Sequence, residues 1–93
     1  MKKIIIKDRE FINELEALQN EVESRQFIIT YILTSNQNIN VDNFNFYQNE
    51  YTKYRALYEN KKLDVEKLYV KPNYPKAKSW NLDFNSGELE IYE

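Results

Sequence analysis

The segment Phe11-Ile-Asn-Glu-Leu-Glu-Ala-Leu-Gln-Asn-Glu-Val22 carries apolar residues at alternating spacings of four and three. The same spacing continues beyond this segment, interrupted by one arginine. The stripe consists of Phe11, Leu15, Leu18, Val22, Arg25, Ile29 and Ile32. Residues at these spacings lie on one face of an α-helix, and the Asp8 carboxylate can accept hydrogen bonds from the free N–H groups at its start. We therefore predict a helix over 8–34, with Leu18 and Ile29 in the core.

A second stripe with similar spacing follows a polar connection at residues 35–40. Its members are Phe44, Tyr47, Tyr51, Tyr54, Tyr58, Val65 and Leu68, with Lys61 or Lys62 in the one gap. We predict a second helix over 41–70, because Pro72 just beyond it has no backbone N–H with which to continue a helix. Helices of similar length that are joined by a short loop favour an antiparallel helical hairpin.

Short strands are predicted near both ends of the chain. Residues 4–6 are all isoleucine, and β-branched side chains suit an extended strand, which we place at 1–7. After a linker at 71–78, apolar residues alternate with polar ones on both sides of the only glycine, Gly87. The alternating apolar residues are Trp80, Leu82, Phe84, Leu89 and Ile91. This pattern predicts a β-hairpin over 79–92.

Together these elements predict an α+β protein with a single domain, residues 1–93. An antiparallel helical hairpin is combined with a short N-terminal strand and a C-terminal β-hairpin. A two-stranded hairpin is barely stable alone, so this one needs the helices beneath it or the N-terminal strand beside it. A domain of this size buries only about two-thirds of its unfolded surface, which leaves its stability marginal.

The composition excludes most catalytic machinery. The chain has no His, no Cys and one Gly. Such a chain cannot form a disulfide, a thiolate nucleophile, a Ser-His pair or a zinc site of His and Cys, and a phosphate-binding loop needs several glycines. Acidic residues remain as general acids or bases, but no spacing marks a pair of them. We therefore expect a protein that is not an enzyme and has no metal ion or cofactor.

Charge and hydropathy argue against a membrane or a nucleic acid as the partner. The net charge is −2, and no apolar run approaches the roughly 18 residues that a membrane span requires. The apolar run near the N-terminus is too short for a signal peptide. Basic residues gather at 53–78 and acidic ones at 8–23, and in a helical hairpin these segments partly neutralise each other. We predict a cytoplasmic protein that binds a protein or a peptide.

Aromatic residues are the main candidates for a binding surface. Tyr51, Tyr54 and Tyr58 lie on the stripe of the second helix, where they either fill a helix or subunit interface or line a ligand surface. The interface interpretation is favoured. Trp80 and Tyr92 belong to the hairpin, where an exposed strand edge could pair with a partner peptide by β-augmentation. We expect Trp80 to be mainly structural, packed against the helices.

The first helix has two unusual features. Arg25 occupies a position in the apolar stripe, where its guanidinium either reaches solvent or makes a buried polar contact, with Glu21 one turn earlier as a ready partner. A contact with an acid of a partner protein is the functional alternative. Residues 27–33 are apolar nearly all round, which one partner helix cannot cover. Either the sheet or another subunit covers the remainder, and we predict a homo-oligomer, with a dimer as the first choice.

The C-terminal hairpin, after the long polar helical pair, resembles the small CXXX-repeat peptide modification system proteins. The resemblance rests on Trp80, Leu82, Phe84, Glu88, Ile91 and Tyr92. Proteins of that family accompany radical-SAM maturases that modify Cys-containing precursor peptides. The resemblance therefore implies an accessory role as a peptide-binding or adaptor subunit without chemistry of its own. The alternative is a phage or mobile-element protein that acts as a stoichiometric inhibitor or sponge of a host protein or nucleotide.

Overall fold

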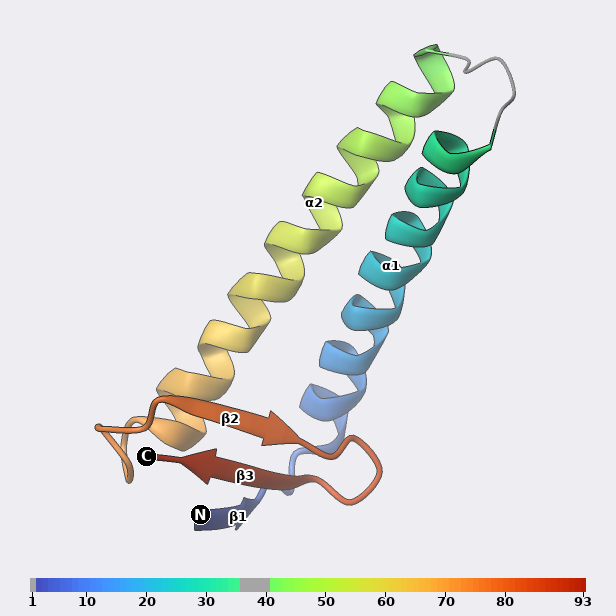
Figure 1. Ribbon diagram of the computed structural model, residues 1–93. Coiled ribbons are helices and arrows are strands. Elements are labelled where there is room, and N and C mark those ends of the chain that lie inside the picture. Colours follow the sequence, from blue (N-terminus) through green and yellow to red (C-terminus); the bar gives the residue numbers. More distant parts are fainter. Residues whose placement is uncertain (1, 36–40) are drawn as a thin grey trace.

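The fold is a pair of helices packed against a small sheet. The computed structural model describes residues 2–35 and 41–93. In chain order the elements are β1 (Lys2–Ile5), α1 (Arg9–Thr34), α2 (Val41–Val65), the π-helical turn η1 (Glu66–Val70), β2 (Ser79–Leu82) and β3 (Glu88–Tyr92). The helices run antiparallel and the strands form one antiparallel sheet (Figure 1). The predicted α+β fold is confirmed, while the connection predicted at 35–40 lies outside the described residues after its first position.

Helix α1 begins at the predicted N-cap. The Asp8 Oδ1 atom accepts a hydrogen bond from the backbone N–H of Phe11 at 3.1 Å. This bond satisfies one of the N–H groups that the first turn of any α-helix leaves without a partner. At the other end, the Ser35 N–H bonds to the Tyr31 carbonyl at 3.0 Å, and the extended backbone of Ser35 stops the helix.

Strand β3 is the central strand of the sheet, whose order is β1-β3-β2. Leu89 faces Ile4 on one neighbouring strand and Leu82 on the other. Ile91 faces Trp80 on β2. Because side chains alternate across a strand, these apolar residues share the face toward the helices, and the remaining β3 side chains lie on the outer face. The sheet thus joins the N-terminal strand to the C-terminal hairpin.

The turn between β2 and β3 is held by a carboxylate and a glycine. The Asp83 Oδ1 atom accepts the backbone N–H groups of Asn85 at 2.9 Å and Ser86 at 3.3 Å, and these bonds lower the pKa of the Asp83 carboxyl. Gly87 has a φ of 77°, a conformation that other residues rarely adopt. Its carbonyl accepts the N–H of Ile6 at 2.8 Å, so the turn is also bonded to the end of β1.

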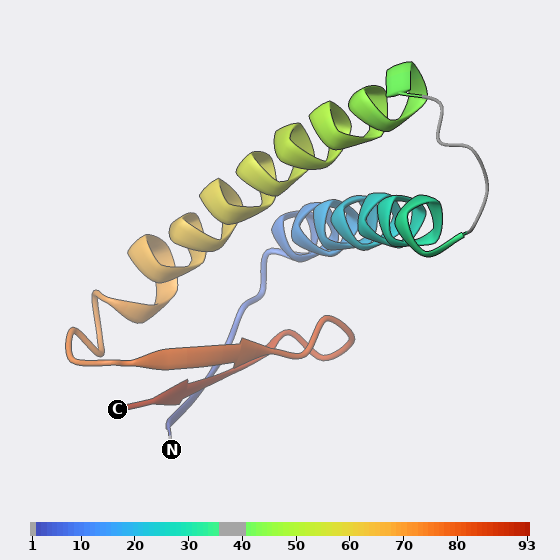
Figure 2. The ribbon, with the colours of Figure 1, turned by 45° about the horizontal axis from the view of Figure 1, so that its top comes forward.

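The hydrophobic core lies at one end of the molecule, where the sheet meets the helices. Its members are Ile6, Phe11, Ile12, Leu15, Val65, Val70, Leu82, Leu89 and Ile91. A helix of 26 residues is about 39 Å long, whereas strands of four or five residues span about 17 Å at most. The sheet therefore covers only part of the helical pair, which extends well past it (Figure 2).

The predicted second helix reaches Val70, but its last turn is π-helical. The Lys71 N–H bonds to the Glu66 carbonyl, five residues earlier, at 2.8 Å. The wider turn lets residues five apart share a side, so Val65 and Val70 are both buried in the core. The prediction that Leu68 lies on the inner stripe is wrong, because this change of period leaves its side chain 60% exposed.

Beyond the core at the sheet the helical pair is loosely covered, and Val22 is the one described residue of α1 and α2 that is buried there. Leu18 and Ile29 are only half-buried, so the prediction that they are core residues is wrong. They lie outside the cluster formed with the sheet and gain cover mainly from the opposite helix. Farther along α1, Phe27 and Tyr31 are exposed by 72% and 61%. The sequence predicts that either the sheet or another subunit covers the apolar segment 27–33. The sheet does not cover this segment.

The position of the core predicts a large effect of truncating Leu89. Its side chain is fully buried at the centre of the sheet, so Leu89→Ala should lower the free energy of unfolding by about 2 to 5 kcal/mol. Leu68→Ala is the matched control and should change it by less than about 0.5 kcal/mol, because that side chain is largely exposed. Urea unfolding followed by circular dichroism measures both, and similar values for the two variants would contradict the placement of the core.

The turn predicts a strong requirement for glycine at position 87. A Cβ atom there would lie 2.7 Å from the Ile6 carbonyl oxygen and 3.2 Å from Ile12 Cδ1. Gly87→Ala should therefore destabilise the fold by about 1 to 3 kcal/mol from backbone strain, with the clash in addition. Asn85→Ala, in the same turn, keeps the backbone bonds and should have little effect. Equal thermal midpoints for wild type and Gly87→Ala would refute this account of the turn.

Candidate functional site

The candidate binding residues do not gather at one place. Tyr58 and Trp80 line the same groove, which lies between β2 and the helices. Tyr54 lies farther from the sheet, in the contact between α1 and α2, against the Arg25 guanidinium. Tyr51 is on α2, one turn before Arg55, and Tyr92 is on the outer face of the sheet. The structure therefore joins only two of the predicted residues in a concave site.

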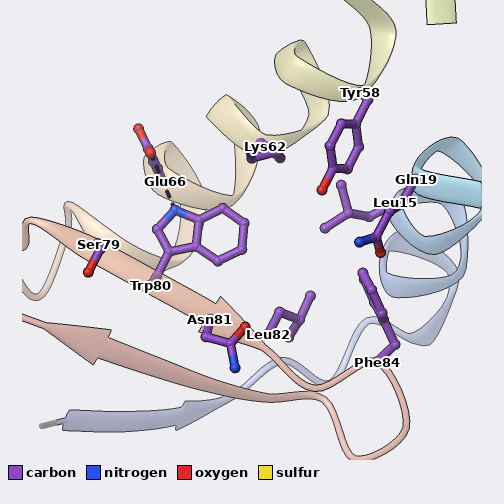
Figure 3. A pocket seen from close by; sticks show the side chains of 10 residues that line it. All are labelled: Leu15, Gln19, Tyr58, Lys62, Glu66, Ser79, Trp80, Asn81, Leu82 and Phe84. Atoms are coloured by element: carbon purple, nitrogen blue, oxygen red, sulfur yellow. Dashed lines mark hydrogen bonds between the residues drawn. The ribbon is translucent and has the colours of Figure 1, made fainter. Parts of the chain in front are cut away.

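We call this site the β2 groove. It has a volume of about 340 Å³ and opens to solvent between the edge of the sheet and α2 (Figure 3). Its lining residues are Leu15 and Gln19 from α1, Tyr58 and Lys62 from α2, Glu66 from η1, Ser79, Trp80, Asn81 and Leu82 from β2, and Phe84 from the turn. Half of these residues are apolar or aromatic and half are polar or charged, so the groove offers a partner both apolar surface and hydrogen-bonding groups.

Trp80 forms one wall of the β2 groove. Its indole Nε1–H donates a hydrogen bond to Glu66 Oε1 at 3.3 Å (Figure 3). Together with Phe84 it packs partly buried against the core, which contains Leu82. The prediction that Trp80 packs against the helices is confirmed. Because the indole is held by both packing and a hydrogen bond, it presents a fixed aromatic surface to the groove.

Tyr58 lies across the groove from the sheet. Its side chain is half-buried against the core, and burial, followed by the charges of Glu59 and Glu23, raises the pKa of its phenol. The hydroxyl therefore stays protonated at neutral pH and remains a hydrogen-bond donor. It points down toward Leu15 and Gln19 (Figure 3). Tyr58 thus contributes both apolar surface and a polar group to the site.

The free edge of β2 runs beside this groove. The Asp83 N–H bonds to the Glu88 carbonyl at 2.9 Å, which fixes the side of β2 that pairs with β3. Since backbone groups alternate in direction along a strand, the N–H groups of Trp80 and Leu82 point away from β3. No further strand lies beyond β2 among the described residues. Among the described residues, no neighbouring strand takes these two N–H groups.

The opposite edge of the sheet, on β1, is less suited to pairing. Lys2 and Lys3 make up half of this short strand, and Lys7 follows it closely. Lysines on an edge strand oppose the addition of another strand. Lys3 also makes an ion pair with Glu88 at 3.1 Å. The groove lies beside β2 alone, so the two edges differ in chemistry.

Arg25 makes contacts within the chain. Its guanidinium forms an ion pair with Glu21, as predicted, and its Cζ lies 4.0 Å from the centre of the Tyr54 ring. The second contact joins α1 to α2 by a cation–π interaction, which contributes about 0.5 to 1 kcal/mol at exposed sites. Arg25 and Tyr54 are therefore interpreted as part of the contact between the helices.

The two remaining predicted residues also have partners in the chain. The Tyr51 hydroxyl accepts a hydrogen bond from Arg55 at 2.7 Å. The Tyr92 hydroxyl donates to Glu90 Oε2 at 2.7 Å, and this bond raises the pKa of the Tyr92 phenol. Neither residue lines the β2 groove.

Several lining residues of the groove were not predicted as site residues. Gln19 and Glu66 are polar residues on long helical segments, where nothing in the sequence distinguishes them from other solvated positions. Phe84 was predicted as part of the hairpin, and Lys62 as filling of a gap in the second stripe. Their common position depends on how the hairpin docks on the helices, which no local pattern encodes.

Residues 2–35 and 41–93 contain no group of three or more acidic side chains that could hold a metal ion. No helix in the same ranges is long and apolar enough to cross a bilayer.

Comparisons of the chain with protein-family profiles, with curated proteins and with solved structures give no match. The function of the β2 groove therefore has to be inferred from its own residues.

Proposed function

We propose that this protein is a non-catalytic peptide-binding or adaptor protein whose site is the β2 groove with the free edge of β2. A partner segment would extend the sheet beside β2 and place one apolar side chain against Trp80 and Tyr58. The observation that carries this proposal is the open groove beside an unpaired strand edge. A strand edge binds the main chain of a peptide whatever its sequence, whereas a pocket beside the edge selects the side chain that the peptide carries there.

The free energy expected from these contacts is sufficient for reversible binding of a peptide. Each main-chain hydrogen bond to the edge contributes about 0.5 to 1.5 kcal/mol net. Burying one large apolar side chain in the groove adds about 1.5 to 3 kcal/mol. Trp80 and Tyr58 are already positioned by the fold, so little conformational entropy is lost on their side.

The ionisable groups of the groove support a binding role. Lys62 lies 3.7 Å from Glu59, and Glu66 accepts the Trp80 indole N–H. The described lining residues contain no pair of a nucleophile and a base within hydrogen-bond reach, which a covalent mechanism needs. We therefore propose stoichiometric binding without turnover. Within this proposal, a precursor peptide of a radical-SAM maturase is the partner that the sequence resemblance implies.

Filling the groove tests the proposal. Gln19→Trp places a large ring in the β2 groove, whereas Asn20→Trp places the same ring at the next, exposed position of α1. The probe is a fluorescein-labelled strand-forming peptide with the core Thr-Val-Phe-Val-Thr. We expect the wild type and Asn20→Trp to bind it with similar affinity in a polarisation titration, and Gln19→Trp to bind about tenfold or more weakly, the loss of roughly one buried anchor.

An amide-resolved NMR titration locates the binding. The backbone N–H signals of Trp80 and Leu82 should shift and become protected from exchange, and the signal of Ile5 on β1 should not. Shifts confined to β1, or unchanged binding by Gln19→Trp, would contradict the assignment of the site.

We also propose that the chain forms a homodimer through the half of the helices that the sheet leaves open. Phe27, Tyr31 and Leu33 are all mostly exposed there, and Phe46 is exposed on α2. The double variant Phe27→Ser/Tyr31→Ser should shift the mass measured by light scattering from two chains to one. A wild-type protein with the mass of one chain at micromolar concentration would refute the dimer.

A further inference from the structure

We infer that the anchor residue of the bound segment, the one whose side chain enters the β2 groove, is a tyrosine. This inference rests on the proposed peptide-binding function and adds the side chain that the groove selects. The phenol ring of the anchor would lie against the aromatic rings of the groove. Its hydroxyl would meet the two neutral polar groups there, the Gln19 amide and the Tyr58 hydroxyl.

Three aromatic rings line the β2 groove. Trp80 comes from β2, Tyr58 from α2 and Phe84 from the turn, and all three are partly buried against the core. Figure 3 shows them on different sides of the groove, with the buried side chains of Leu15 and Leu82 between them. Aromatic rings that pack edge to face or offset are stabilised by more than their buried area alone. An aromatic anchor is therefore favoured over an aliphatic one.

Two neutral polar groups face the same space. The Tyr58 hydroxyl points toward the Gln19 side chain, and both residues line the groove (Figure 3). Neither group has a hydrogen-bond partner within the described residues. Since no buried side-chain N or O atom of the described residues lacks a partner, both groups are accessible to solvent. A ligand that covers them without bonding to them would leave them unsatisfied, which costs free energy.

The charged groups of the groove do not favour a charged anchor. The Lys62 ammonium lies 5.1 Å from the centre of the Tyr58 ring and 3.7 Å from Glu59 Oε2. The Glu66 carboxylate accepts the Trp80 indole N–H. The lining residues thus contain one lysine and one glutamate, each in contact with a neighbour, and no excess of either charge. We therefore expect a neutral anchor.

Tyrosine is the aromatic residue whose tip matches both polar groups. Burial raises the pKa of the Tyr58 phenol, so its hydroxyl stays protonated and can donate. A phenol hydroxyl both accepts and donates a hydrogen bond, whereas an indole N–H only donates and a phenyl ring does neither. A tyrosine anchor can thus accept from Tyr58 while it donates to the Gln19 amide. A phenylalanine would leave both groups unpaired, and sites that bond a hydroxyl discriminate against such analogues.

An added strand presents alternate side chains to the groove. Trp80 and Leu82 face the helices, so a partner residue paired opposite either of them points the same way. Its two neighbours in the peptide point to the outer face of the sheet. Selection by the groove therefore acts on one residue between two outward-facing ones.

A series of peptides with one variable residue tests this inference. All have the core Thr-Val-X-Val-Thr, with Tyr, Phe, Trp or Leu as X, and each competes with the fluorescein-labelled Phe peptide in a polarisation assay. We expect the Tyr peptide to bind about three- to tenfold more tightly than the Phe peptide, the gain of roughly one net hydrogen bond. The Trp and Leu peptides should also bind more weakly than the Tyr peptide.

Removing the two polar groups from the protein locates the effect. Gln19→Leu/Tyr58→Phe keeps the approximate size of both side chains and should bring the Tyr and Phe peptides to equal affinity. Its affinity for the Phe peptide should equal or exceed that of the wild type. Gln26→Leu/Tyr47→Phe makes the same two changes outside the β2 groove and should keep the preference for tyrosine.

The wild-type protein provides a second measurement that needs no variant to fold. The NMR signals of the Gln19 side-chain amide should shift further with the Tyr peptide than with the Phe peptide, because only the Tyr peptide bonds to this group. The side-chain amide signals of Gln26 should respond equally to both peptides.

The outcomes separate this inference from the proposed function. Equal binding of the Tyr and Phe peptides, both blocked by Gln19→Trp, would overturn the inference and leave peptide binding intact. Tighter binding of the Trp or Leu peptide, a preference for tyrosine that survives in Gln19→Leu/Tyr58→Phe, or equal shifts of the Gln19 amide would do the same. Failure of every peptide to bind would overturn both the inference and the proposed function.

Discussion

The packing of Leu89 and Ile91 beneath the helices is the interaction on which the structure depends. Both side chains are fully buried on β3, the strand that pairs with both others. Each edge strand pairs only with β3, so both depend on β3 being held in place by this packing. A two-stranded hairpin alone would be barely stable. The same contact sets how the hairpin docks, so it also creates the β2 groove between the edge of the sheet and α2. Stability and the candidate site therefore have a common origin.

The molecule divides into a packed end and an open end. At the packed end, a short sheet and the first turns of α1 bury the core, and the Lys61 ammonium joins the helices through Glu14 at 2.6 Å. At the open end, Val22 is buried, and the rest of the contact between the helices consists of half-buried side chains, among them tyrosines and the Arg25–Tyr54 pair. Aromatic rings with polar tips suit such a boundary between apolar contact and water. The proposed peptide site lies at the packed end and the proposed dimer surface at the open end, so the two need not compete.

The sequence predicted the elements well because each has a strong local signal. The four-and-three spacing gave α1, the Asp8 cap gave its start, and the alternation around Gly87 gave the hairpin. Leu68 was misplaced because a π-helical turn changes the period, and Leu18 and Ile29 because a stripe does not reveal how far the sheet reaches. For the site, Trp80 and Tyr58 were found by their aromatic character. Gln19 and Glu66 were missed because their role depends on the docking of distant segments.

The proposed site requires that β2 has a free edge beside the groove, while β3 pairs with a strand on each side. Amide hydrogen exchange of the free protein, measured residue by residue by NMR, tests it directly. We predict fast exchange for the N–H groups of Trp80 and Leu82, and slow exchange for those of Asn81 and Leu89, which face a neighbouring strand. Strong protection of the Trp80 and Leu82 N–H groups in the free protein would show that this edge is already covered, and would contradict the proposed site.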